Sequence, residues 1–154
     1  MILRAFFAMA VVTAVAVPAY AEEAATCAPI AKADVERLFD RWNDSLKTGD
    51  PEKVADNYAE DAILLPTVSN KPRLTREERV DYFTEFLKKE PVGVIDSRVI
   101  KIGCNTAVDA GLYTFTLHGH DLVHARYTFT YEFKDGKWGI AHHHSSAMPE
   151  KAGS

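Results

Sequence analysis

The sequence predicts an α+β domain in which three N-terminal helices pack against a cone-shaped, curved antiparallel sheet. Two observations lead to this fold class. Apolar residues recur at helical spacing in the first half of the chain, and from Val94 onward they alternate with polar residues at the spacing of β-strands. Helices followed by a run of strands are typical of α+β proteins. A sheet bent around helices leaves a conical hollow, which is a common place for a small ligand.

The first two predicted helices are separated by Gly49. The first helix has an apolar stripe at spacings of three and four residues, formed by Val35, Leu38, Phe39, Trp42 and Leu46. The second helix is short and begins at Asp50-Pro51, because Asp is favoured at the N-cap and Pro at the first helical position.

The third predicted helix begins at Thr75, which has the spacing of a capping box with Glu78. Its apolar stripe contains Val80, Phe83 and Leu87, and Pro91 ends it. A short strand at residues 62–66, where the sequence reads AILLP, is predicted between the second and third helices.

Four further strands are predicted in the second half of the chain. They cover residues 94–102, 107–118, 123–133 and 138–146, where apolar and polar residues alternate. Asp135-Gly136 favours a tight hairpin between the last two strands. These strands complete the sheet.

The first 21 residues are predicted to be a signal peptide that is removed. Arg4 precedes an apolar run, and Ala19-Tyr20-Ala21 fits the small-residue rule for cleavage. The alternative is a transmembrane anchor, but the run at 5–17 is shorter than the ~20 residues that a spanning helix needs. We therefore expect a periplasmic or secreted protein with no membrane contact after cleavage, organised as a tail (22–32), one domain (33–149) and a disordered end (150–154).

The two cysteines, Cys27 and Cys104, are expected to form a disulfide, because an exported protein with an even cysteine count favours pairing. The alternative is a pair of free thiols. The formal net charge of −4 and the lack of a basic run argue against a nucleic-acid partner. The sequence has no glycine-rich phosphate loop, nucleophile elbow or CxxC motif, so no cofactor is expected.

The segment RYTFTYEFKDGKWGIAHHHSSAMP, residues 126–149, resembles the association (hub) domain of calcium/calmodulin-dependent protein kinase II and its bacterial secreted relatives. Residues 42–66 and 67–73 share this resemblance, and 49–62 is also similar to SnoaL-like polyketide cyclases and ketosteroid isomerases. The resemblance spans about residues 33–149. It implies the cone fold of the nuclear-transport-factor-2-like superfamily, a pocket, and a homodimer or a higher ring, but no particular reaction.

The three consecutive histidines are the first candidate site. Strand alternation places His142 and His144 on the face of Trp138 and Ile140, which is predicted to face the cavity. The resemblance also matches His142 and His144 to histidines of the hub ending. Three interpretations stay open: ligand binding with His144 as general base, ordinary hydrogen-bonded histidines, and a metal site completed by another histidine. The metal interpretation is the weakest because no third ligand has a recognisable spacing.

Arginines are the second candidates. Arg126 lies on the polar face of its strand, opposite aromatic residues, which predicts a solvent-facing side chain. The resemblance favours the cavity instead, since hub domains place arginines there, and a β-bulge could turn Arg126 inward. A buried guanidinium would require an anionic partner and thus a carboxylate-bearing ligand. Arg98 and the loop residue Arg73 are weaker candidates.

Aromatic residues are the third set. The aromatic residues predicted to line the cone, with plain core packing as the alternative, are Trp42, Tyr58, Tyr82, Phe86 and Tyr113. Tyr58 and Tyr113 could donate hydrogen bonds to a ligand.

Three functions remain open from the sequence. The first is an exported, homo-oligomeric module that binds a small anionic organic ligand. The second is an isomerase, cyclase or hydratase in which His144 is the base and Arg126 or Tyr113 stabilises an oxyanion. The third is a purely structural assembly domain.

Overall fold

The structure is a computed structural model that describes residues 26–67 and 69–150. The predicted signal peptide lies outside the described residues, and so do residues 22–25 and 151–154 of the two predicted tails.

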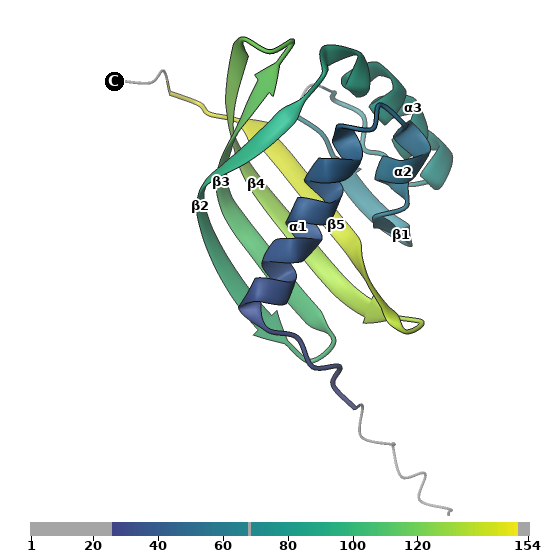
Figure 1. Cartoon of the computed structure of the whole chain (residues 1–154). Coiled ribbons are helices and arrows are strands. Elements are labelled where there is room, and N and C mark those ends of the chain that lie inside the picture. Colours follow the sequence, from purple (N-terminus) through teal and green to yellow (C-terminus); the bar gives the residue numbers. More distant parts are fainter. Residues whose placement is uncertain (1–25, 68, 151–154) are drawn as a thin grey trace, which may run out of the picture.

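Helices and a single five-stranded sheet follow one another along the chain (Figure 1). The helical elements are α1 (Lys32–Leu46), α2 (Pro51–Ala55), α3 (Arg76–Phe86) and the 3-10 turn η1 (Leu87–Lys89). The strands are β1 (Tyr58–Leu65), β2 (Val92–Gly103), β3 (Thr106–Leu117), β4 (Asp121–Lys134) and β5 (Lys137–Ala147). The α+β fold class predicted from the sequence is confirmed.

The sheet is curved, and its strands lie in the order β1-β5-β4-β3-β2. Strands β2 to β5 pair antiparallel, as predicted, whereas β1 pairs parallel with β5 at one edge. Strand β1 begins at Tyr58, four residues before the predicted start, so Tyr58 belongs to the sheet. Helix α1 crosses the concave face of the sheet, and α2 and α3 lie beside β1 (Figure 1).

The predicted helix caps are present. The Asp50 carboxylate accepts hydrogen bonds from the backbone N–H groups of Glu52 and Lys53 at the start of α2. At the start of α3, the Thr75 hydroxyl accepts from the Glu78 N–H, and the Glu78 carboxylate accepts from the Thr75 N–H. These bonds satisfy N–H groups that have no partner inside the helix.

The core lies between α1 and the concave face of the sheet. The apolar stripe of α1 is buried through Val35, Phe39, Trp42 and Leu46. It meets the aromatic face of β4, where Tyr127, Phe129 and Tyr131 are each at most 3% exposed. The predicted Cys27–Cys104 disulfide is present and ties the segment before α1 to the turn between β2 and β3.

A β-bulge at Ala141 changes which residues of β5 face the core. Ile140 pairs with Tyr131 of β4 and His142 pairs with the next residue, Thr130, so Ala141 has no partner of its own. The extra residue reverses the alternation. Beyond the bulge, His143 and Ser145 point inward, and the predicted inward placement of His142 and His144 is wrong.

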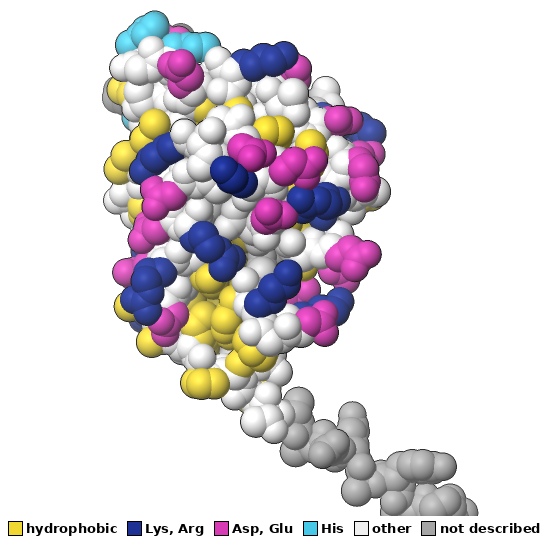
Figure 2. Space-filling model, turned by 45° about the vertical axis from the view of Figure 1, so that its right-hand side comes forward, with side chains coloured by type: hydrophobic (Ala, Val, Ile, Leu, Met, Phe, Trp, Pro, Cys, Tyr) yellow, Lys and Arg dark blue, Asp and Glu magenta, His cyan; other side chains and the backbone are white. Residues whose placement is uncertain are grey.

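Charged side chains of both signs are interspersed on the face that Figure 2 shows, without a field of one sign. Within residues 26–67 and 69–150, no helix is long and apolar enough to cross a membrane.

Candidate functional site

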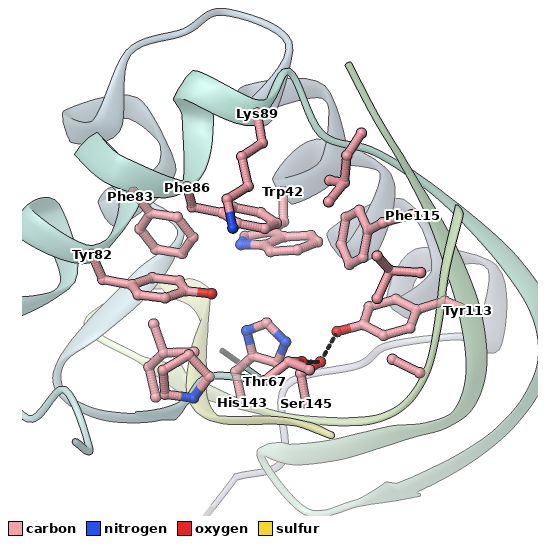
Figure 3. A pocket seen from close by; sticks show the side chains of 15 residues that line it. Trp42, Thr67, Tyr82, Phe83, Phe86, Lys89, Tyr113, Phe115, His143 and Ser145 are labelled. Carbon is pink, nitrogen blue, oxygen red and sulfur yellow. Dashed lines mark hydrogen bonds between the residues drawn. The ribbon is translucent and has the colours of Figure 1, made fainter. Parts of the chain in front are cut away.

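The concave side of the sheet encloses a cavity with aromatic walls (Figure 3). Its free space is about 550 Å³ when the part that is open to solvent is included. The volume in which the centre of a water molecule could lie is much smaller, about 50 Å³. By the second measure it has room for about three or four waters, so it suits small molecules. The lining residues are Trp42, Leu64, Pro66, Thr67, Tyr82, Phe83, Phe86, Lys89, Tyr113, Phe115, Leu117, Val123, Ala125, His143 and Ser145.

His143 forms part of the polar floor of this cavity, with its imidazole ring directed into it (Figure 3). The ring stacks on Phe129 with 4.0 Å between centroids and meets Trp42 edge-on at 5.2 Å. Its Nδ1 atom lies 2.9 Å from the Tyr58 hydroxyl oxygen. Its Nε2 atom is buried and has no hydrogen-bond partner within the described part of the chain.

Burial determines the charge state of His143. The side chain is 3% exposed, and loss of solvation lowers its pKa to about 3. The charges of the neighbouring His142 and His144 also lower the pKa of His143, by less than burial does. His143 is therefore neutral near pH 7, and one of its nitrogens carries a proton while the other accepts a hydrogen bond.

Three hydroxyl groups continue the floor beside His143. The Tyr113 hydroxyl donates to Ser145 Oγ at 2.5 Å, and Ser145 Oγ also forms a hydrogen bond with Thr67 Oγ1. Burial raises the pKa of Tyr113 well above its usual range, so the phenol remains protonated. The floor therefore offers neutral polar groups that can hydrogen-bond to a ligand.

Lys89 is the charged residue of the cavity lining, and Figure 3 shows its side chain reaching toward the space above His143. Lys89 forms no ion pair with another described residue. Among the described residues, no Asp or Glu lines the cavity. The positive charge of Lys89 thus has no internal counterpart.

A second cation lies behind the floor. Arg79 is 1% exposed, and its guanidinium lies 5.6 Å from the centroid of the Tyr58 ring. It donates hydrogen bonds to backbone carbonyls of Ala59, Glu60 and Ala62 in β1 and of Leu74. These contacts hold α3 against β1, and they leave the charge without a carboxylate at hydrogen-bonding distance within the described residues. Arg79 therefore adds a second buried positive charge behind Tyr58.

Beyond the mouth, an outer groove carries three acidic and three basic side chains and has mixed charge. Arg73 belongs to this groove: its guanidinium lies 5.8 Å from the centroid of the Tyr82 ring and donates to Ser69. The charged members of the groove are Lys71, Arg73, Lys89, Glu78, Asp81 and Glu85.

The histidines predicted for the site do not reach the cavity. His144 is exposed and His142 is half-buried, and both lie on the convex face because of the bulge at Ala141. His144 therefore cannot serve as a base in the cavity. Across residues 26–67 and 69–150, no group of three or more His, Cys, Asp or Glu side chains is arranged to hold a metal ion.

The arginines are also outside the cavity. Arg126 is exposed, because β4 keeps its regular alternation around this residue and turns its aromatic face inward. The hypothesis that a bulge turns Arg126 inward is wrong. Arg98 forms a 2.8 Å ion pair with the fully buried Asp109 and lies over the Phe39 ring. Its charge is compensated within the protein.

Four of the five predicted aromatic residues line the cavity: Trp42, Tyr82, Phe86 and Tyr113. Tyr58 lies behind His143 and does not line it, although its hydroxyl contacts the imidazole. Four polar lining residues were missed at the sequence level: Thr67, Lys89, His143 and Ser145.

The comparisons with known proteins identify relatives of this architecture. The family described as the calcium/calmodulin dependent protein kinase II association domain matches residues 31–149. The chain is similar to a Xanthomonas campestris protein assigned to the same association domain, with 52% identity and a TM-score of 0.74, covering 84% of this chain and 99% of that one. No curated protein matched.

More distant structures share only the fold. One is an NTF2-like protein of unknown function from Pseudomonas putida KT2440, with 15% identity, a TM-score of 0.69, and coverage of 79% of this chain and 89% of that one. Another is assigned as an NTF2-like dehydratase from Streptomyces avermitilis, with 14% identity, a TM-score of 0.64, and coverage of 75% and 94%. The chain has the NTF2-like fold and belongs to the calcium/calmodulin dependent protein kinase II association domain family.

Proposed function

We propose that this protein is an exported binding module that holds a small carboxylic acid in the cavity above His143. The observation that carries the proposal is His143, a residue of the cavity lining whose Nε2 atom is buried and has no partner within the described residues. Leaving a buried polar group unpaired costs about 1–3 kcal/mol. A ligand that supplies a hydrogen-bonding group at this position removes that cost.

The electrostatics of the cavity favour an anion. Lys89 lies at the mouth without an ion-pair partner among the described residues, and the walls are largely aromatic. The apolar part of a small acid would pack against Trp42, Phe86 and Phe115, while its carboxylate lies between His143 and Lys89. A few well-placed polar groups in an aromatic pocket are typical of small-molecule sites.

The geometry supports binding better than proton-transfer catalysis. A histidine whose pKa is about 3 is a poor base near neutral pH, and burial also raises the pKa of Tyr58 and Tyr113. The cavity lining contains no carboxylate among the described residues, so a carboxylate base is not available there. We therefore place the isomerase-like alternative second.

Self-association through the convex face of the sheet is part of the proposal. Val92 and Leu122 both neighbour Thr116 across three strands, and Val94 lies two residues along on the same face. Val92, Val94 and Leu122 are 41%, 58% and 60% exposed. Exposed apolar groups of this kind often mark protein interfaces. Light scattering should give a mass above that of one chain, and Val94→Lys should lower it.

Ligand binding can be tested by calorimetric titration of the mature protein with acetate, 3-methylbutanoate, benzoate and phenylacetate. At least one acid should bind, and Lys89→Met should weaken it about tenfold, because it removes a charge-assisted contact. Lys88→Met is the matched control, since Lys88 is an adjacent, exposed lysine outside the cavity. If no acid binds, or if both variants lose affinity equally, the proposed site is wrong.

A further inference from the structure

A chain of hydrogen bonds fixes the proton of His143. Trp42 Nε1 lies 3.1 Å from the Tyr58 hydroxyl oxygen, and that oxygen lies 2.9 Å from His143 Nδ1. An indole N–H can only donate, so the Tyr58 oxygen accepts from Trp42. The described residues offer the hydroxyl proton of Tyr58 no acceptor other than Nδ1, so we assign Tyr58 as the donor and Nδ1 as the acceptor.

This assignment determines what the cavity presents to a ligand. A neutral imidazole with Nδ1 as acceptor carries its proton on Nε2. His143 belongs to the cavity lining, and its Nε2 atom is buried without a partner in the described chain. The imidazole therefore offers a donor, and a ligand group placed against it must accept.

The charges around the cavity also favour a ligand group that accepts hydrogen bonds and carries a negative charge. Lys89 reaches into the space opposite His143 (Figure 3). The guanidinium of Arg79 lies 5.6 Å from the centroid of the Tyr58 ring. No Asp or Glu among the described residues lines the interior, and the acidic side chains of the outer groove lie beyond the mouth. An ammonium group inside would meet two nearby cations and only neutral hydroxyl oxygens as acceptors.

From these observations we infer that the cavity selects simple carboxylic acids and rejects the corresponding α-amino acids. The inference rests on the proposed function and narrows its ligand class. The carboxylate satisfies the His143 donor and the Lys89 charge. An α-ammonium would be desolvated without an anionic partner, which is unfavourable. Tyr58 is a positioning residue, because it orients the imidazole without lining the cavity.

The test compares 3-methylbutanoate with valine, which differ only by the α-amino group. Calorimetric titration of the mature wild-type protein should show binding at least about tenfold tighter for 3-methylbutanoate. Phenylacetate and phenylglycine form a second matched pair. Equal affinities within both pairs would overturn the inference and leave the proposed function intact, whereas the absence of binding by any acid would overturn both.

The hydrogen-bond assignment is tested without ligand by ¹⁵N NMR of the histidine rings. His143 should show a protonated Nε2 and an unprotonated Nδ1. Tyr58→Phe should shift the Nδ1 resonance, because it removes the hydrogen bond to that atom. Tyr131→Phe is the matched control, since Tyr131 is a buried tyrosine outside the cavity. A proton on Nδ1 in the wild type, or equal shifts in both variants, would contradict the inference.

Discussion

Acidification should destabilise this protein through His143. Its pKa is about 3 in the folded state, because burial disfavours the charged imidazole, against an ordinary value of 6.5. The unfolded chain therefore binds a proton that the folded chain does not, and stability falls as the pH drops below 6.5. Between pH 7 and pH 5 the lost free energy of unfolding is about 2 kcal/mol, at about 1.4 kcal/mol per pH unit.

The assay is urea unfolding at a series of pH values for the wild type and His143→Gln. Other groups titrate over the same range, so the informative quantity is the difference between the two proteins. The wild type should lose about 2 kcal/mol more than His143→Gln between pH 7 and pH 5. His144→Gln, an exposed neighbour on the same strand, should behave like the wild type. If His143→Gln shows the same pH dependence as the wild type, His143 is not the buried neutral group described above.

Three further predictions concern the disulfide, the close approach of β3 to β2 at Gly111, and the buried ion pair of Arg98 with Asp109. Replacing Cys27 and Cys104 by Ser should lower the free energy of urea unfolding by about 4 kcal/mol, since their bridge closes a long loop; an unchanged value would contradict this. In Gly111→Ala the new methyl group would overlap a backbone carbonyl of β2, so the thermal midpoint should fall with a cost of about 3 kcal/mol. Arg98→Met should cost about 3 kcal/mol because it leaves the carboxylate of Asp109 buried and unpaired. Adding Asp109→Asn should recover part of that loss.

The fold could be predicted from sequence because its local signals agree with one another. The apolar stripe of α1, the Asp50 and Thr75 caps and the Asp135-Gly136 hairpin all appear where the patterns placed them. The parallel pairing of β1 with β5 could not be predicted from the sequence, because it joins segments that are far apart in the chain. No local pattern encodes such a pairing.

The site was harder to predict, because the extra residue of the β-bulge in β5 determines which side chains of that strand face the cavity. The sequence placed an imidazole of the HHH run in the cavity, but the bulge at Ala141 selects His143 instead of His142 or His144. A bulge depends on the pairing partner and leaves little trace in a single strand. The run itself carried the useful signal: whichever register applies, at least one of three consecutive histidines faces inward.

Arg126 and Lys89 show two other limits. The alternation of β4 predicted a solvent-facing Arg126, and the structure agrees, so the inference taken from the resemblance was the misleading one. Lys89 was missed because a lysine near the end of a helix usually faces solvent. Its position above the cavity depends on the packing of α3 and η1 against the sheet, which is a tertiary property.

The most direct test of the central claim is a crystal structure of the mature protein with 3-methylbutanoate. A carboxylate oxygen should lie within about 2.7–3.2 Å of His143 Nε2, with the branched end against the aromatic wall. The claim is contradicted if the acid binds elsewhere, or if it occupies the cavity with its carboxylate turned away from His143.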